Sequence, residues 1–165
     1  MCNAREGSRT LRLTRLVSEH AEVGCTVAVM GLSYKPGTNV IEQSQGILVA
    51  SALSKMGYRI IVHDPMATDA ARAVLGSTVN YAGSPEEALE AAEVIILLIP
   101  WPQYRSLPVD SAVARSSRVI IDCWRLVDRD ALQPGIRVIQ LGLNAPIPVL
   151  PDAGAAVNLL ALERG

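Results

Sequence analysis

Continuous hydrophobic runs recur along this chain at intervals that suit short buried strands. Six of them have this character: residues 27–30, 60–62, 78–81, 94–99, 119–121 and 138–139. The third run is weaker than the others. Because their apolar residues are continuous rather than alternating with polar ones, the runs are typical of strands buried on both faces of a parallel sheet.

Segments with helical spacing separate these strands. They cover residues 44–56, 67–75, 85–92 and 110–114. Ser84 has the position of an N-cap, followed by a proline and two acids, while Gly57 and Gly76 stand where helices end. Right-handed crossovers between successive strands then predict an α/β fold. We expect a doubly wound, mostly parallel six-stranded Rossmann-like sheet with helices on both faces and strand order 3-2-1-4-5-6.

Both ends of the chain depart from this pattern. Residues 10–20 show a basic amphipathic pattern, which fits either the end of a longer connecting helix or a simple surface helix. The stretch after residue 143 is rich in proline. We therefore expect three parts: an N-terminal arm and connecting helix at 1–22, a Rossmann-like ligand-binding domain at 23–143 and a proline-rich tail at 144–165.

Amino-acid composition limits the classes of protein to which the chain can belong. The chain has 165 residues, of which 50% are hydrophobic, and this is enough for one compact core. No run reaches the roughly 20 apolar residues that span a bilayer, and the polar start has no signal-peptide core. We therefore expect a cytoplasmic protein without a membrane partner.

The net charge of -1, with Arg5, Arg9, Arg12 and Arg15 crowded at the start, argues against a nucleic-acid partner. Three cysteines without a CxxC or Cys/His spacing predict reduced thiols and no metal site.

The loop at residues 31–37 is the first candidate site, because ligands of doubly wound sheets bind beyond the carboxyl ends of the strands. A dinucleotide fingerprint needs three closely spaced glycines, whereas the two glycines of this loop are separated by five other residues. Tyr34 and Lys35 offer a ring and a point charge instead. This pair suits a phosphorylated nucleoside better than NAD held by backbone. The alternative for Lys35 is an ordinary solvated lysine, although the chain has only one other lysine, Lys55.

Aromatic residues follow the first, fourth and fifth predicted strands. They are Tyr34, Trp101, Tyr104 and Trp124. A base stacked on an aromatic ring gains roughly 1–3 kcal/mol, so a base or a sugar could bind among these rings. The alternative is that Trp101 and Trp124 close the top of the core.

Charged residues end the second and fifth predicted strands. Asp64 could accept a hydrogen bond from a ribose, or it could form the turn that Asp-Pro favours. Arg125 could bind a phosphate through two N–H groups, or it could form an ion pair with Asp122. His20 and His63 lack the neighbours that a hydrolytic triad requires. No catalytic residue is therefore predicted.

Four blocks of the chain share their order and spacing with a known family over about 100 residues. They are GLSYKPGTNVIEQS at 31–44, DP with a following small residue at 64–67, IPWPQYRSL at 99–107 and IDCWRLVD at 121–128. They resemble GLSFKPxTDDxRES, DP with a small residue, TEWPEF and IDGRNxLD in the C-terminal, UDP-binding domain of the UDP-glucose/GDP-mannose dehydrogenase family. The resemblance implies a Rossmann-like nucleotide-sugar binding domain whose ligand is a UDP-sugar.

The resemblance also implies roles for single residues. In that family the aromatic residue and the lysine after the first strand lie near the nucleotide and its phosphates. The substrate-binding candidates here are Tyr34, Lys35, Trp101, Tyr104 and Arg125. Arg125 lies one position after the place of the family's arginine. Glu42 stands where the family usually has an arginine, and this reversal of charge disfavours a diphosphate.

Complete members of the family oxidise a UDP-sugar to a uronic acid with NAD, in polysaccharide biosynthesis. They require an NAD-binding domain and a central helical domain with a nucleophilic cysteine, and we expect neither segment within these 165 residues. By this resemblance the chain alone is expected to be inactive, to bind no NAD by itself and to have those domains as partners. A homodimer is a further possible assembly. Two alternatives stay open: a ligand-free interaction or oligomerisation module with a decayed site, and a small CoA-binding domain.

Overall fold

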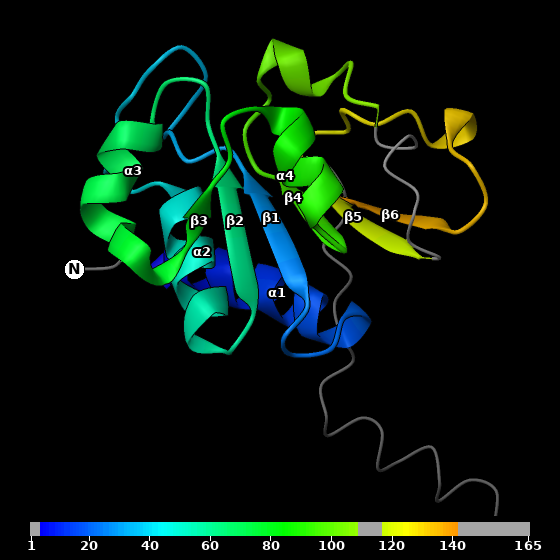
Figure 1. Cartoon of the computed structure of the whole chain (residues 1–165), viewed down its shortest axis with the longest axis horizontal. Coiled ribbons are helices and arrows are strands. Elements are labelled where there is room, and N and C mark those ends of the chain that lie inside the picture. The colour runs from blue at the N-terminus through cyan, green and yellow to red at the C-terminus, as the bar shows by residue number, and fades with distance from the viewer. Residues whose placement is uncertain (1–3, 109–116, 142–165) are drawn as a thin grey trace, which may run out of the picture.

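The computed structural model describes residues 4–108 and 117–141. Its centre is a six-stranded sheet with the order β3-β2-β1-β4-β5-β6 (Figure 1). The strands are β1 (Thr26–Met30), β2 (Arg59–His63), β3 (Asn80–Tyr81), β4 (Val94–Leu97), β5 (Arg118–Asp122) and β6 (Ile136–Gln140). All five neighbouring pairs are parallel. The predicted strand order and the doubly wound α/β fold are therefore confirmed.

Helices cover both faces of the sheet. In Figure 1, α1 (Ala4–His20) and α2 (Gln45–Lys55) lie behind the sheet, and α4 (Pro85–Ala91) lies in front of it. α4 packs against β1 and β2. The remaining elements are α3 (Thr68–Leu75) and the 3-10 turns η1 (Gly76–Thr78), η2 (Pro102–Tyr104) and η3 (Arg129–Ala131). Within the described ranges, no helix has both the length and the apolar character needed to cross a membrane.

Most element boundaries differ from the prediction by one or two residues. Ser84 accepts a hydrogen bond from the Glu87 amide at 3.2 Å, which confirms it as the N-cap of α4. Gly57 and Gly76 have positive φ angles of 95° and 56° and end their helices as expected. α1 begins earlier than residue 10, because the six polar or small residues before it continue the helix. The predicted helix at 110–114 and the predicted tail at 144–165 lie outside the described residues.

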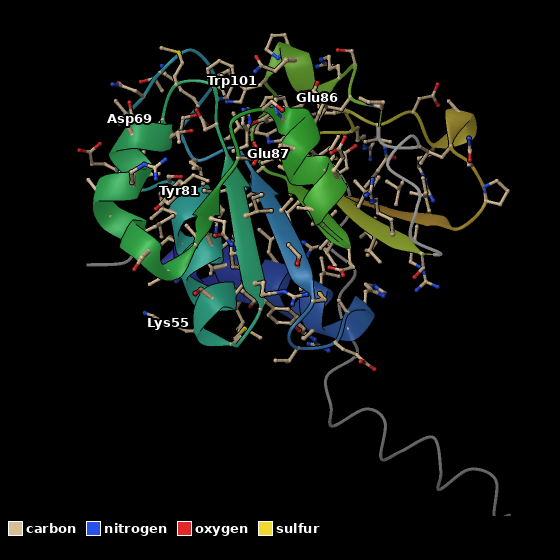
Figure 2. All side chains as sticks on the ribbon, in the orientation of Figure 1. Lys55, Asp69, Tyr81, Glu86, Glu87 and Trp101 are labelled. Atoms are coloured by element: carbon tan, nitrogen blue, oxygen red, sulfur yellow. The ribbon has the colours of Figure 1, made fainter. Side chains whose placement is uncertain are left out.

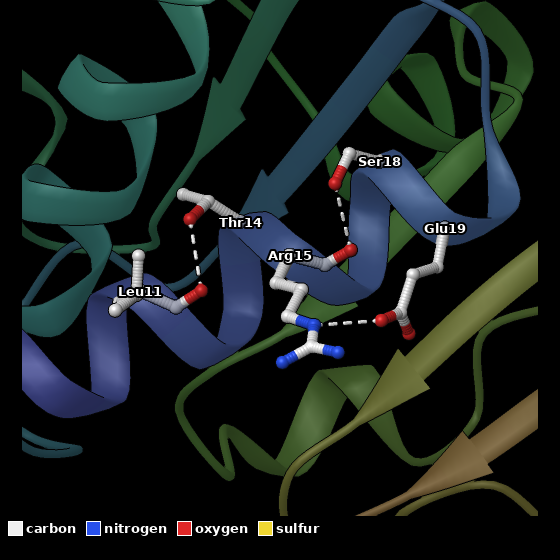
Figure 3. Close-up of polar contacts among 5 residues, drawn as sticks. All are labelled: Leu11, Thr14, Arg15, Ser18 and Glu19. Atoms are coloured by element: carbon white, nitrogen blue, oxygen red, sulfur yellow. Dashed lines mark hydrogen bonds and ion pairs between the residues drawn. The ribbon is translucent and has the colours of Figure 1, made fainter. Parts of the chain in front are cut away.

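The N-terminal helix packs on the sheet through one apolar face. Leu13 and Val17 are buried in the core, while the opposite face of α1 carries exposed side chains. The hydroxyls of Thr14 and Ser18 donate to main-chain carbonyls one turn earlier, at 3.1 and 2.9 Å (Figure 3). Burial of the Leu13 and Val17 side chains makes α1 a part of the same core as the sheet.

A close approach of backbone to backbone joins α2 to the loop after β1. A Cβ atom on Gly46, in the first turn of α2, would overlap the carbonyl oxygen of Gly31 and lie 3.0 Å from the Cα of Leu32. No larger residue fits there without moving the helix, so Gly46 performs the packing role of a glycine in a strand-to-helix turn.

Replacing Gly46 with alanine should therefore lower the free energy of unfolding by about 2 kcal/mol, the usual range for an overpacked core. Gly7→Ala in α1 is the matched control, because a Cβ there meets no atom within 4 Å. That control should be neutral or stabilising by roughly 0.5–1 kcal/mol, through the helix propensity of alanine. Urea unfolding of both variants measures the difference, and equal effects would contradict the close approach.

Candidate functional site

Four loops meet where β1, β2, β4 and β5 end, and we call this side of the sheet the carboxyl edge. Asp64 directly follows β2 and is only 3% exposed. Its Oδ2 atom accepts hydrogen bonds from the amides of Leu32 and Ser33, at 2.8 and 3.0 Å, and from the Ser33 hydroxyl at 3.0 Å. The indole N–H of Trp101 donates to the same oxygen at 3.2 Å. One carboxylate thus joins the loops that follow β1, β2 and β4.

The second oxygen of Asp64 forms the turn at the end of β2. Oδ1 accepts from the amides of Met66 and Ala67, at 2.9 and 2.8 Å, and so starts the approach to α3. Burial alone would raise the pKa of Asp64, but the amide donors of Met66, Leu32, Ser33 and Ala67 stabilise the carboxylate and lower its pKa on balance. The turn interpretation of Asp64 is therefore confirmed, and the carboxylate is ionised at neutral pH.

The loop held by Asp64 presents two side chains to solvent. The Tyr34 amide donates to the Val40 carbonyl at 2.7 Å, which closes the loop around residues 35–39. Tyr34 is 56% exposed, and Lys35 is exposed beside it. Among the described residues, the Lys35 ammonium has no ion-pair partner. A ring face and an unpaired cation are thus both accessible at the carboxyl edge.

Trp101 and Tyr104 have a different environment from Tyr34. Trp101 is 7% exposed and lies beyond the carboxyl end of the sheet, with its N–H bound to Asp64 (Figure 2). Tyr104 is 1% exposed, and its hydroxyl donates to the His63 carbonyl at 3.1 Å and lies 2.9 Å from the His63 Nδ1 atom. The prediction that Tyr104 contacts a ligand is therefore corrected, because its ring is buried in the core. Both residues thus bind groups at the end of β2, Trp101 through Asp64 and Tyr104 through His63.

The end of β5 is organised by a second buried carboxylate. Asp122 is fully buried and accepts from the amides of Trp124 and Val127, at 3.1 and 2.9 Å. It binds backbone rather than forming the ion pair with Arg125 that was one of the alternatives. The Trp124 indole donates to the Leu98 carbonyl at 2.7 Å, yet the side chain remains 38% exposed. Trp124 and Arg125 therefore both reach solvent at the carboxyl edge.

Backbone strain marks the same region. Within the described ranges, the non-glycine residues with positive φ are Gln43, at 58°, and Arg125, at 55°. Gln43 precedes α2 directly before its N-cap, Ser44, and Arg125 follows β5. The left-handed conformation costs a non-glycine residue roughly 1 kcal/mol or more, and such residues cluster at functional sites. The strain is thus an independent indication that the carboxyl edge is functional.

A shallow depression beside β3 is the competing location. It has a volume of about 500 Å³ and is lined by Arg72, Gly76, Ser77, Val79, Asn80 and Tyr81. The Arg72 guanidinium already stacks over the Tyr81 ring, 4.1 Å from its centre. Because this cation and ring bind each other, they offer less to a ligand than Tyr34 and Lys35 do. No group of three metal-binding side chains occurs in the described part of the chain.

Sequence reasoning missed three features of this site. The two amides and the indole bound by Asp64 could not be assigned from the Asp-Pro pair alone. Gly46 was passed over, although a lone glycine in the first helical turn after a strand is a signal of close packing. The left-handed backbone of Arg125 had no signal, since arginine is not a residue that marks positive φ.

Comparison with known proteins bears on the same residues. Residues 28–129 match the family model described as UDP-glucose/GDP-mannose dehydrogenase family, UDP binding domain. The chain belongs to this family. The resemblance inferred from the four sequence blocks is thus confirmed, and it covers the whole carboxyl edge as described above.

Individual relatives give the same result. UDP-glucose 6-dehydrogenase AglM from Haloferax volcanii is 34% identical over 119 residues, which cover 72% of this chain and 27% of that protein. A UDP-glucose 6-dehydrogenase from Pseudomonas aeruginosa is 34% identical over 124 residues, covering 72% and 26%. The chain therefore spans about a quarter of the length of these relatives.

Solved structures agree on the fold. A UDP-glucose dehydrogenase from Pyrobaculum islandicum superposes with a TM-score of 0.63 at 35% identity, covering 70% of this chain and 26% of that one. An NDP-N-acetyl-D-galactosaminuronic acid dehydrogenase from Methanosarcina mazei gives a TM-score of 0.66 at 20% identity, with 81% and 28% coverage. The second match concerns the fold alone.

Proposed function

We propose that the carboxyl edge of this chain binds the UDP part of a nucleotide sugar. The observation that carries the proposal is the Asp64 carboxylate, which fixes the loop after β1 so that Tyr34 and Lys35 are both exposed. The Tyr34 ring stacks with the base or the sugar, and the Lys35 ammonium binds the diphosphate. Trp101 supports this arrangement through Asp64 rather than by stacking.

The loop after β1 does not fit NAD. Backbone N–H groups near a helix N-terminus would have to bind the pyrophosphate. Here the amides of Leu32 and Ser33 donate to Asp64, that of Gly31 donates to the His63 carbonyl at 2.8 Å, and that of Tyr34 donates to Val40. The residues present therefore do not fit the dinucleotide, and we assign NAD to another part of the enzyme.

In the complete enzyme, we propose, this domain holds the UDP-sugar while NAD-dependent oxidation to a uronic acid takes place on other domains. A nucleophilic thiol must be a thiolate to react. Burial raises the pKa of Cys25, and it raises the pKa of Cys123 to about 12, so neither of these thiols is activated. The chain by itself is therefore proposed to bind without catalysing the oxidation.

Arg125 is the third proposed ligand contact, and its strain provides a test. Arg125→Asn should leave the stability unchanged or raise it by up to about 1 kcal/mol, because asparagine tolerates the left-handed conformation better. The same change should weaken UDP binding roughly tenfold through loss of a charge-assisted hydrogen bond. Arg129→Asn, at an exposed arginine in η3, is the control for both measurements. Loss of stability without loss of binding would make Arg125 a structural residue.

Calorimetric titration of the chain with UDP, UDP-glucose, GDP-mannose, CoA and NAD tests the proposed function. We expect UDP and UDP-glucose to bind and NAD not to bind. Binding of CoA alone would favour a small CoA-binding domain. Absence of heat with every nucleotide at millimolar concentration would favour an interaction module whose site has decayed, a reading supported by Glu42 in the exposed loop.

A further inference from the structure

The last residue of β2 contacts a tyrosine from the segment after β4. His63 is 5% exposed and Tyr104 is 1% exposed, so both rings are almost closed to solvent. The two rings meet edge to face, with their centres 5.8 Å apart. The main-chain carbonyl of the same histidine also accepts from the Gly31 amide at 2.8 Å. His63 therefore binds both Tyr104 and the first residue of the loop after β1.

The hydrogen atoms of this pair follow from which atoms can donate. The Tyr104 hydroxyl has a single hydrogen, and its oxygen lies 3.1 Å from the His63 carbonyl oxygen and 2.9 Å from the His63 Nδ1 atom. A carbonyl can only accept, so the hydroxyl donates to the carbonyl and Nδ1 donates to the hydroxyl. His63 is therefore assigned as the neutral tautomer with its hydrogen at Nδ1. The Nε2 atom has no hydrogen-bond partner in the part of the chain that the structure describes.

A second proton on His63 is unfavourable in this arrangement. It would create an Nε2–H donor that is shielded from water and faces no acceptor among the described residues, and such a donor costs free energy. Burial lowers the pKa of His63. The carboxylates of Asp64, after β2, and of Glu86 and Glu87, in the first turn of α4, act in the opposite direction but are outweighed. Protonation thus favours a conformation in which the ring leaves Tyr104 and reaches water.

The segment that carries Tyr104 also carries Trp101. The Tyr104 amide donates to the Trp101 carbonyl at 3.0 Å, which closes the single turn of η2. The Trp101 indole donates to Oδ2 of Asp64, and the same oxygen accepts from two amides of the loop after β1. A continuous series of hydrogen bonds therefore connects the buried pair with the loop that presents the proposed ligand contacts.

We propose that the His63–Tyr104 pair positions the loop after β1 and releases it when the His63 ring gains a proton, so that acid weakens binding of the nucleotide sugar. This inference rests on the proposed function and adds a regulation of the same site. The proton comes from water and is bound at Nε2, the ring atom without a partner. Both residues act through Trp101 and Asp64, because their own rings are closed to the ligand. The apparent affinity falls with the fraction of molecules whose loop is held in place.

The pH dependence of UDP-glucose binding tests the inference. UDP-glucose is the probe because the terminal phosphate of UDP itself titrates near about pH 6. We expect the Kd to stay within about twofold down to the pKa of His63 and to rise roughly tenfold over the next pH unit. His63→Asn places an amide N–H at about the position of Nδ1 but cannot gain a proton, so its Kd should not depend on pH.

His20→Gln, at the other histidine of the chain, is the matched control and should retain the wild-type pH profile. Tyr58→Phe and Tyr104→Phe form a second pair, because each loses a hydroxyl that donates to a main-chain carbonyl, but Tyr58 donates to Ala21, next to the start of the sheet. Tyr104→Phe should raise the Kd for UDP-glucose roughly fivefold at neutral pH, and Tyr58→Phe should leave it within about twofold. A pH profile shared by the wild type and His63→Asn would overturn the inference.

The ligand-free protein gives an independent readout, which also decides the matter if His63→Asn fails to fold. In an NMR titration of the wild type, the Trp101 indole N–H and the amides of Leu32 and Ser33 should shift with the same midpoint as the His63 ring. A ring that titrates without these shifts, or stays neutral down to about pH 4.5, would overturn the inference.

The two readouts also separate this inference from the proposed function. If UDP-glucose binds with a Kd that does not depend on pH, the proposed function stands and the regulation is wrong. If UDP-glucose does not bind at any pH but the loop shifts follow the His63 ring, the coupling stands and the nucleotide is wrong.

Discussion

Asp64→Asn should destabilise the protein by about 4 kcal/mol and disorder the loop that carries Tyr34 and Lys35. The carboxylate accepts six hydrogen bonds, four at Oδ2 and two at Oδ1, and it is almost fully buried. An amide nitrogen in place of either oxygen would face N–H donors that then have no acceptor. Each buried donor left without a partner costs about 1–3 kcal/mol. Urea unfolding with two-state analysis measures the loss.

Asp69→Asn is the control for this substitution. Asp69 is exposed in the first turn of α3, so removing its charge should cost about 1 kcal/mol or less. If Asp64→Asn costs no more than this control, the carboxylate does not organise the carboxyl edge.

The lowered pKa of Asp64 predicts that the stability of the protein depends on pH. The pKa of Asp64 is lower in the folded protein than in the unfolded chain, where an aspartate titrates near about 3.9. The ionised Asp64 carboxylate therefore contributes fully to the free energy of unfolding above the pKa of the unfolded chain. This contribution disappears as the pH falls through the lower pKa of the folded protein. The stability of the Asp64→Asn variant should fall less steeply than that of the wild type over this acidic range.

Lys35→Gln should weaken UDP binding by roughly a hundredfold, about 3 kcal/mol, with no change in stability. The ammonium is exposed and unpaired among the described residues, so its loss affects the ligand rather than the fold. Hydrogen bonds to charged groups contribute up to about 3 kcal/mol. Calorimetric titration at two salt concentrations should also show a weaker salt dependence for the variant.

Lys55→Gln is the matched control for Lys35→Gln. Lys55 is the other lysine of the chain, and it lies in the last turn of α2 at the end of the sheet opposite Trp101 (Figure 2). Its replacement should leave UDP binding unchanged. Equal effects of the two substitutions would show only a general response to net charge.

Much of the fold followed from hydrophobic pattern alone. Each central strand is a continuous apolar run, such as residues 94–97 of β4, because a strand covered on both faces has no polar side. Short helical segments between such runs leave right-handed crossovers as the available connection. The register of α1 was beyond this reasoning, because its contact with Gln45 depends on packing between distant segments.

The site was predicted only in part for the same physical reason. Position after a strand was enough to select the loop of Tyr34 and Lys35. It was not enough to tell an exposed ring from a buried one, since Tyr34 and Tyr104 both follow strands. The Tyr104 ring is buried, and its hydroxyl donates to the carbonyl of His63, a residue 41 positions earlier in the chain. The sequence alone gives no sign of this long-range partner.

Titration of isotope-labelled protein with UDP, followed by amide chemical shifts, tests the central claim most directly. We predict saturable shifts at residues 33–40 and at Arg125, with no comparable shifts beside β3. Shifts confined to the depression that contains Arg72 and Tyr81, or no shifts at millimolar UDP, would contradict the assignment of the ligand site to the carboxyl edge.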